Sequence, residues 1–566
     1  MTEYSAKPLV EVDGSAVETE VDLRLERAVV DDHALLPDMF ELQFRDPHKD
    51  VFERARIRIG STVRLLAGRQ GEEATELLVN GEVTGLEADF DASGTHAVVR
   101  GYDASHRLHR GRRTETYRNV TDADVVRAVA ARAGLQLGRV DETPTVHRHV
   151  SQANVTDWEL LTSRAREIGY ELSVEDGRLE YRKPAEATEA PEPGDLNSTN
   201  VHQLVLGSNL DAFRPRLSSA EQVNEVQVRG WDPEKKQAVV GRAPVGSSGA
   251  SLAAVPADLA AAFGGPTYVS ADRPFSQQSE VDDAARAIAD QIGSSFAEAE
   301  GTAHGNPRLK AGSAISVGLT GRSFDGLYAI TACRHVFDRN GYKTHFVVTG
   351  RHDQSLLGLA TASKPGRGEG APPLAGVVVA QVTSISDPDE QARVKLSFPW
   401  LADTYETDWV RLVQPGAGDR RGMVVVPEVN DEVIVAFEHG DIRRPYVLGG
   451  LYNGVDKPWL GDGFVDSGTG EARRRGFVSK RGHSIVFFDA DDDDGLALLT
   501  GDRSLRISLN KSSTTVKVSS SGKVTIEAAD EVSVTGNKIE LAAKSGVSID
   551  GGAGDVVVKG TQIKLN

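Results

Sequence analysis

Only a few residues in this sequence have the types and spacing that metal chemistry would need. His147 and His149 alternate along an expected strand, so both imidazoles would lie on one face, where they could share a metal ion. No third ligand is evident nearby, and a surface or packing pair is the better interpretation. The sequence contains no GxSxG, HExxH or GxxxxGKS/T motif. We therefore predict no catalytic, cofactor-binding or metal residues, and a protein that is not an enzyme.

Three further segments are candidates for binding calcium or nucleic acid. The acidic run Asp489–Gly495 could attract Ca²⁺ if several copies met, but it lacks EF-hand spacing, so we interpret it as a charged β-turn and leave ion binding open. Gly551–Asp555 nearly matches a calcium-binding nonapeptide, but it does not recur, and we predict a turn. The basic run His106–Arg113 is better explained as a solvated loop or as a contact with an acidic neighbour than as a nucleic-acid groove.

The composition limits the class of protein. A length of 566 residues predicts several domains, and 57 glycines favour a β-rich chain with many turns. The net charge of −19 repels phosphates, so nucleic acids and anionic membranes are poor partners. Cys333 is the single cysteine, which fits folding in a reducing cytoplasm. We expect no secretory leader and no membrane span.

The last 60 residues carry a repeat with a period near eight. Two apolar residues flank a middle residue that is usually polar, and turn-forming residues separate one pair from the next. The eight pairs are Ile507/Leu509, Val516/Val518, Val524/Ile526, Val532/Val534, Ile539/Leu541, Val547/Ile549, Val556/Val558 and Ile563/Leu565. One short strand of this kind cannot form a core, but stacked repeats can, which predicts a β-solenoid or β-helix rod.

The elements ahead of the repeat are mostly strands with three helices. Thr121 caps a helix that ends at Gly134, the capping box of Thr156 and Glu159 begins a helix that ends at Gly169, and a third helix fits 281–296. Linkers or surface insertions are expected at Lys183–Asn197 and Lys364–Pro373, together with an insertion of unassigned structure near 242–280. Short strands predict a small barrel of the OB type. They lie at Gly376–Val382, Ala392–Leu396, Asp408–Val413, Gly422–Val426, Glu432–Phe437 and Tyr446–Gly450.

Ordered motifs in this barrel resemble those of the VgrG family, the central spike of contractile injection machines. They are Asp387–Lys395, Phe398–Leu401, Pro427–Val433, Phe437–Pro445 and Leu448–Gly454. Weaker similarities to VgrG lie at Gly101–Leu108, Ser151–Leu161 and Arg481–Ile485. The loose match of the N-terminal half favours the group of phage-tail-like particles.

The resemblance implies a mainly β homotrimer with phage-tail-hub-like β-barrel modules, a few helices, an OB barrel and a triple-stranded β-helix needle. The expected boundaries are 1–182 and 198–363 for two hub modules, 374–455 for the OB barrel, 456–479 for a connector and 480–566 for the needle. The expected function is to join tube and baseplate proteins to the tip and to puncture the target envelope. The alternatives are a peptidoglycan-degrading tail enzyme and a polysaccharide-binding adhesin. The connector is too short for a muramidase domain, and we expect none after the needle.

The end of the needle suggests one contact site. A β-prism that ends there would expose strand edges and apolar core, which proteins usually cover. We therefore predict that Ile563, Leu565 and Asn566 of three chains bind a PAAR-like tip protein. Effector cargo is a further expected partner, and we expect assembly in the bacterial cytoplasm with release on contraction.

Overall fold

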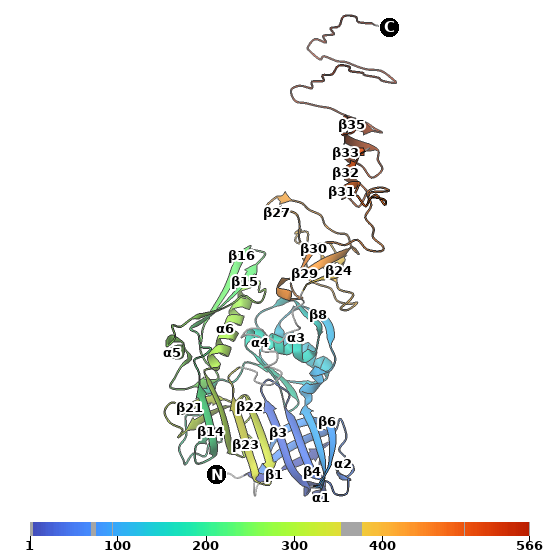
Figure 1. The fold of residues 1–566 in the computed structure, drawn as a ribbon. Coiled ribbons are helices and arrows are strands. Elements are labelled where there is room, and N and C mark those ends of the chain that lie inside the picture. Colours follow the sequence, from blue (N-terminus) through green and yellow to red (C-terminus); the bar gives the residue numbers. More distant parts are fainter. Residues whose placement is uncertain (1–3, 70–74, 93, 352–375, 492, 565–566) are drawn as a thin grey trace. The chain divides into compact units, whose positions relative to one another are not determined.

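The computed structural model describes residues 4–69, 75–92, 94–351, 376–491 and 493–564 (Figure 1). It divides into two compact units, Met1–Leu451 and Tyr452–Asn566. The first unit contains the two predicted hub modules and nearly all of the predicted barrel. The predicted linker Lys364–Pro373 lies outside the described residues.

One eleven-stranded sheet connects the two hub modules. Its order is β14-β19-β23-β22-β3-β4-β7-β6-β5-β1-β2, and antiparallel pairing of β22 with β3 joins the modules. The strands are β1 (Tyr4–Val12), β2 (Ser15–Ala16), β3 (Leu25–His33), β4 (Met39–Arg45), β5 (Thr62–Arg69), β6 (Thr75–Asp91), β7 (Gly94–Asp103), β14 (Leu210–Leu217), β19 (Ala297–His304), β22 (Ala332–Asp338) and β23 (Gly341–Val348). The short helices α1 (Thr19–Asp22) and α2 (Val51–Arg54) lie between strands of this sheet in the chain. Alternating apolar residues from these strands, such as Phe40, Leu42 and Phe44 on β4, form a buried core.

The two predicted helices of the first module are confirmed. Helices α3 (Asp122–Ala133) and α4 (Asp157–Ile168) both begin with complete capping boxes, at Thr121 and Thr156. Both end at a glycine with positive φ, 67° at Gly134 and 72° at Gly169, a conformation that glycine adopts without strain. They pack with η1 (Ala104–His109), β8 (Arg113–Val120), β9 (Gln136–Val140), β10 (His147–Val155), β11 (Glu171–Glu175) and β12 (Arg178–Arg182).

The predicted third helix is also confirmed, as α6 (Gln278–Ser294), which starts three residues earlier than expected. It buries Ala285, Ile288 and Ile292 against the sheet β16-β15-β18, which consists of β15 (Glu225–Asp232), β16 (Gln237–Pro244) and β18 (Thr267–Ser270). The region near 242–280 also contains β17 (Ala250–Ser251) and α5 (Pro256–Ala261). Strand β17 lies in the sheet β13-β20-β21-β17 with β13 (Gln203–Val205), β20 (Ala314–Gly318) and β21 (Gly326–Ala329).

The segment Lys183–Asn197 differs from the linker that its composition suggests. It contains the short helix η2 (Ala187–Glu189), and the Ala187 side chain is buried. The Ala187 N–H donates to the Ser248 carbonyl at 2.7 Å, and the Glu192 carbonyl accepts from the Ser316 hydroxyl at 3.3 Å. Backbone hydrogen bonds therefore attach this proline-rich segment to the second module.

The predicted barrel forms a five-stranded sheet of order β25-β24-β29-β30-β26. Its strands are β24 (Val377–Ser384), β25 (Lys395–Ser397), β26 (Arg411–Leu412), β29 (Glu432–Phe437) and β30 (Pro445–Gly450). η3 (Glu438–Gly440) follows β29, and single bridges join Val394 to Val410 and Ser397 to Glu406. The predicted strand Gly422–Val426 is wrong for the single chain, where only β28 (Arg421–Gly422) pairs with β27 (Ala417–Gly418).

The second unit begins with an antiparallel meander that includes part of the predicted connector. Its strands are β31 (Arg474–Val478), β32 (Ser484–Ala490), β33 (Asp493–Leu499), β34 (Leu505–Asn510) and β35 (Thr515–Ser520). The first two repeat pairs lie on β34 and β35, as predicted. From 521 to 564, the described residues of the single chain form no helix or strand. Nowhere in the described ranges is a helix long and apolar enough to cross a membrane.

Candidate functional site

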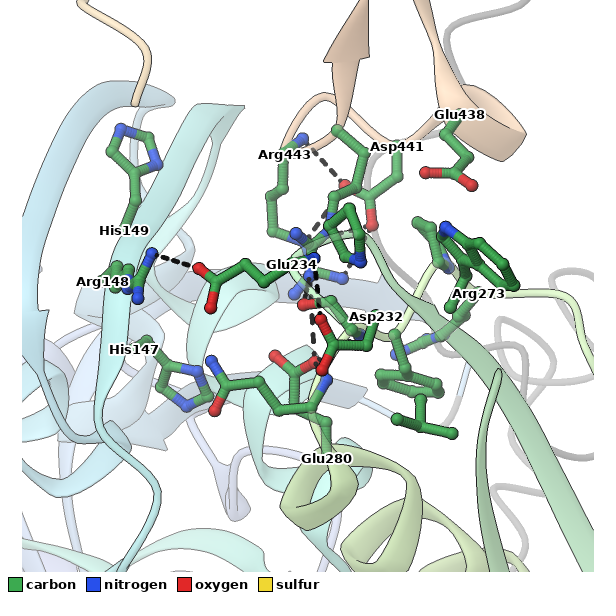
Figure 2. A pocket seen from close by; sticks show the side chains of 18 of the residues that line it. His147, Arg148, His149, Asp232, Glu234, Arg273, Glu280, Glu438, Asp441 and Arg443 are labelled. Atoms are coloured by element: carbon green, nitrogen blue, oxygen red, sulfur yellow. Dashed lines mark hydrogen bonds and ion pairs between the residues drawn. The ribbon is translucent and has the colours of Figure 1, made fainter. Parts of the chain in front are cut away.

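A cavity of about 810 Å³ lies where both hub modules and the barrel meet. Figure 2 shows the side chains that converge on it. His147 and His149 come from β10 of the first module, Arg273 from the segment before α6, and Arg443 from the barrel. Because three modules supply its walls, groups in this cavity can hold the modules in one arrangement.

Glu167 is the centre of an ionic cluster in this cavity. It forms ion pairs with Arg164 on its own helix, with Arg273 at 2.5 Å and with Arg443 at 3.2 Å. Burial alone would raise the pKa of Glu167, but the charges of Arg164, Arg443 and Arg273 outweigh burial and lower this pKa well below its usual range. The carboxylate is therefore ionised at neutral pH and links the three modules electrostatically.

The arginines around Glu167 have further carboxylate partners. Asp122 accepts from Arg164 Nε at 2.6 Å, and Asp441 accepts from Arg443 Nη2 at 2.8 Å. Figure 2 shows Asp441 and Arg443 side by side on the barrel segment. A buried charge is tolerated only when it is paired and hydrogen-bonded, and this network pairs each of the charges.

A second contact joins the barrel to β8 and β10 of the first module. The Glu406 carboxylate accepts from Arg118 Nη2 at 2.7 Å, and the Glu406 carbonyl lies 3.2 Å from His149 Nε2. The hydroxyl groups of Ser151 and Tyr405 are 2.9 Å apart. Together with the Glu167 cluster, these contacts attach the barrel to the hub through two separate groups of side chains.

The two histidines that were weighed as metal ligands have other partners. His147 Nε2 lies 3.1 Å from Asp122 Oδ2 and 2.7 Å from Arg164 Nη2, whereas His149 contacts the Glu406 backbone. Within the described ranges, no group of three His, Cys, Asp or Glu side chains could hold a metal ion. Both imidazoles thus contact other groups of the same unit in this structure.

The charged runs have local partners as well. Asp489 pairs with Arg475, and Asp494 pairs with Lys511 at 2.6 Å, so these two carboxylates bind cationic side chains across neighbouring strands. In the basic run, His106 Nε2 lies 2.7 Å from Glu82 Oε2, and Arg107 pairs with the same carboxylate. The expected acidic neighbour of the basic run is thus Glu82 on β6.

A smaller cavity of about 230 Å³ lies near β3, β7 and the loop around Lys310, and its lining includes Asp32, Asp38 and Asp103. Asp32 accepts from the Ala311 N–H at 3.1 Å, and Asp103 accepts from the Asp38 N–H at 3.1 Å. Burial raises the pKa of Asp32 to about 7 and that of Asp103 to about 6. Burial, together with the other two carboxylates, also raises the pKa of Asp38.

This cluster predicts a specific dependence of stability on pH. Because the folded pKa of Asp32 lies above its ordinary value of 3.8, the folded state binds the proton more tightly. The resulting stabilisation is complete at acidic pH and is lost as the pH rises towards 7. The midpoint of urea unfolding, measured between pH 4.5 and 7.5, should therefore fall with rising pH. In Asp32→Asn, this slope of the midpoint against pH should be smaller. Asp31→Asn, which removes the half-exposed ion pair with Arg334, should retain it, and equal slopes for the two variants would contradict the assignment.

The needle is the second candidate site. Its repeat pairs expose their apolar side chains in the single chain, as at Ile526, which is 77% exposed, and at Leu541, which is 74% exposed. Ile563, the described member of the predicted tip contact, is also exposed, whereas Leu565 and Asn566 lie outside the described residues. In the described part of the single chain, the apolar side chains of the repeat pairs after β35 are therefore exposed to solvent.

The sequence did not reveal the Glu167 cluster. Arg273 and Arg443 lie 106 and 276 positions from Glu167, and no motif connects the three residues. The local signal was a charged residue on the same helix face as Leu160 and Arg164, which are both buried.

Comparisons with known proteins agree with this architecture. The model of the type VI secretion system/phage-baseplate injector OB domain matches residues 378–452, and the model of the Alg8 N-terminal domain matches 48–338, slightly more than half of the chain. The type VI secretion system spike protein VgrG2a of Pseudomonas aeruginosa is 38% identical over 74 residues, 12% of this chain and 9% of that protein. VgrG5 of the same organism is 32% identical over 127 residues, 21% of this chain and 15% of that protein. The match thus spans only a small part of these curated relatives.

The whole fold has a solved counterpart. A chain of the half-lidded PdpA-VgrG complex of Francisella has a TM-score of 0.53 at 9% identity, over 91% of this chain and 88% of that one. This likeness supports the fold, and the family models identify its parts. The chain belongs to the Alg8 N-terminal domain family by its match over residues 48–338, carries an injector OB domain at residues 378–452, and is similar there to VgrG spike proteins.

Proposed function

We propose that this spike protein works as a homotrimer at the tip of a contractile, phage-tail-like injection machine. The hub modules join it to tube and baseplate proteins, and the needle punctures the target envelope when the sheath contracts. The observation that carries this proposal is the needle segment 521–564. Its apolar side chains are exposed and its described residues form no strand within one chain.

Three copies of the chain would supply the strand partners and the apolar contacts that this segment lacks in one chain. Three chains wound about one axis would turn the paired apolar residues inwards and supply the missing strand partners. Burying one valine or isoleucine side chain contributes roughly 1.5–3 kcal/mol, so the six repeat pairs after β35 can together offset the cost of ordering the segment. Intertwined strands also resist mechanical separation, which suits a puncturing device.

Purification of intact particles tests this function. A spike should copurify with tube and sheath proteins at the tapered end of the particle, where a labelled antibody can locate it by electron microscopy. A polysaccharide-binding adhesin would instead be recovered without tube and sheath proteins, and that result would contradict the proposal.

An enzymatic role has less support. One similar protein is named an actin cross-linking toxin, VgrG1 of Vibrio cholerae, but the match covers 76 residues, 7% of that protein. We propose a mechanical role without catalysis. Measurable peptidoglycan turnover by the purified trimer would favour the tail-associated hydrolase instead.

A tip partner follows from the same exposed needle. We propose that a PAAR-like protein binds the end formed by Ile563, Leu565 and Asn566 of three chains. Deletion of residues 559–566 should abolish its capture in a pull-down, because the exposed apolar end would be removed. A matched deletion within the turn at 551–554 should retain capture. Unchanged binding after the terminal deletion would contradict the proposed contact.

The remaining partners and the location are also proposals. Effector cargo could travel with the tip, whereas the acidic chain makes nucleic acid an unsuitable partner. We propose assembly in the bacterial cytoplasm and ejection on contraction, because the single cysteine suits a reducing compartment.

A further inference from the structure

The OB barrel presents an apolar surface where an isolated barrel would present a polar one. On β24 and β29, alternate residues such as Ala380 and Val433 fill the barrel core. Two successive outward pairs are apolar, Val377 opposite Ala436 and Val379 opposite Ile434, whereas the next outward pair is Gln381 and Glu432. Antiparallel strands with one solvated face usually place polar residues outwards. The two apolar outward pairs therefore depart from the pattern of a strand pair that remains in water.

Trp400 extends this surface. Its indole N–H donates to the Val379 carbonyl at 2.9 Å, and half of its side chain stays exposed. A tryptophan whose indole N–H is hydrogen-bonded and whose ring is partly exposed is typical of a protein–protein interface. We call Val377, Val379, Trp400, Ile434 and Ala436 the apolar face.

The same barrel carries a segment that could cover such a face. Residues 423–426, here called the arm, follow the β27–β28 hairpin and include Val424, which is 77% exposed. Three consecutive valines strongly favour a strand, yet in the described chain the arm pairs with none. The side chain of Gln414 holds it in place, because its amide donates to the Val425 carbonyl at 2.7 Å and accepts from the Val425 N–H at 3.2 Å.

We infer that the arm of one chain packs on the apolar face of the next chain around the threefold axis. The inference rests on the proposed homotrimer and names the interface that the barrels would contribute. A ring of three copies needs two different, complementary surfaces on each copy, and this module supplies an apolar projection and an apolar face. The occupant is a second copy because the needle that follows in the chain also requires copies for its apolar residues.

The arrangement predicts specific cross-links between chains. Chains with Val424→Cys and one affinity tag should be coexpressed with chains that carry Val379→Cys and a second tag. The native Cys333 is buried and will not react quickly with a short bismaleimide. Both substituted side chains are exposed in the single chain, so its folding does not depend on them. A covalent dimer that carries both tags is the expected product.

The control pairs Val424→Cys chains with Phe263→Cys chains. Phe263 is 78% exposed but lies after α5 in the second module, away from the apolar face in sequence and fold, so no cross-link is expected. If both tags copurify in a trimer but the Val424–Val379 cross-link does not form, the arm contact is wrong and the proposed trimer still holds. Tags that never copurify would overturn both. In a separate preparation, one chain carries both Val424→Cys and Val379→Cys. A cross-link that forms within this chain, without any cross-link between the two singly substituted chains, would place the arm on its own barrel and overturn the inference.

Discussion

Replacing Glu167 by alanine will destabilise the first unit by about 3–5 kcal/mol, the cost of leaving buried charges without their partner. The substitution removes the carboxylate shared by Arg164, Arg273 and Arg443. Arg164 and Arg443 would each retain an ion pair with an aspartate. Among the described residues, Arg273 forms an ion pair only with Glu167 and would lose it. The midpoint of urea unfolding, followed by tryptophan fluorescence, measures the effect.

Glu234→Ala is the matched control for this prediction. Glu234 lines the same cavity and pairs with Arg148 at 2.9 Å, but both side chains are more than half exposed. Since exposed ion pairs contribute about 0–1 kcal/mol, this variant should unfold close to the unsubstituted protein. Glu167→Gln keeps the shape while removing the charge, and it should resemble Glu167→Ala. Equal midpoints for the Glu167 and Glu234 variants would show that the cluster does not hold the modules together.

Aspartate in place of both Val532 and Val534 will prevent formation of the trimer. In a threefold needle the six carboxylates would lie near one axis, and each would cost roughly several kcal/mol to bury without a counter-ion. This is enough to shift the assembly equilibrium by many powers of ten, so monomer should predominate at micromolar concentration. Light scattering coupled to size-exclusion chromatography measures the state of assembly.

Ser533→Asp is the control within the same repeat. Ser533 lies between the two valines, so on a strand its side chain points to the opposite face, towards solvent. The variant adds one carboxylate per chain at nearly the same position and should remain trimeric. If Ser533→Asp disrupted assembly as strongly as the valine pair, the inward orientation of the repeat valines would be wrong.

Local signals in the sequence predicted the elements that depend on local physics. The capping box at Thr156 predicted α4 and the cap at Thr121 predicted α3, because the cap hydrogen bonds form between residues three positions apart. Strand β29 matches its predicted bounds because alternation of buried and outward residues specifies it. The OB motifs identified the barrel that the injector OB domain model also matches.

Features that depend on distant partners could not be predicted in this way. The valines after Gly422 favour a strand, but a strand needs a neighbour, and the described single chain provides none. Lys183–Asn197 resembles a linker in composition, whereas its contacts with Ser248 and Ser316 arise only in the folded module. The Glu167 cluster joins residues from three modules, so its pairing depends on the complete fold.

The mass of the purified chain in solution distinguishes a threefold spike from a monomer. One chain has a mass of 60.7 kDa, and we expect a particle of three chains, about 182 kDa, that keeps this mass on dilution. A stable monomer of 60.7 kDa would contradict the account, because the needle segment 521–564 would then keep its apolar residues in water without partner strands.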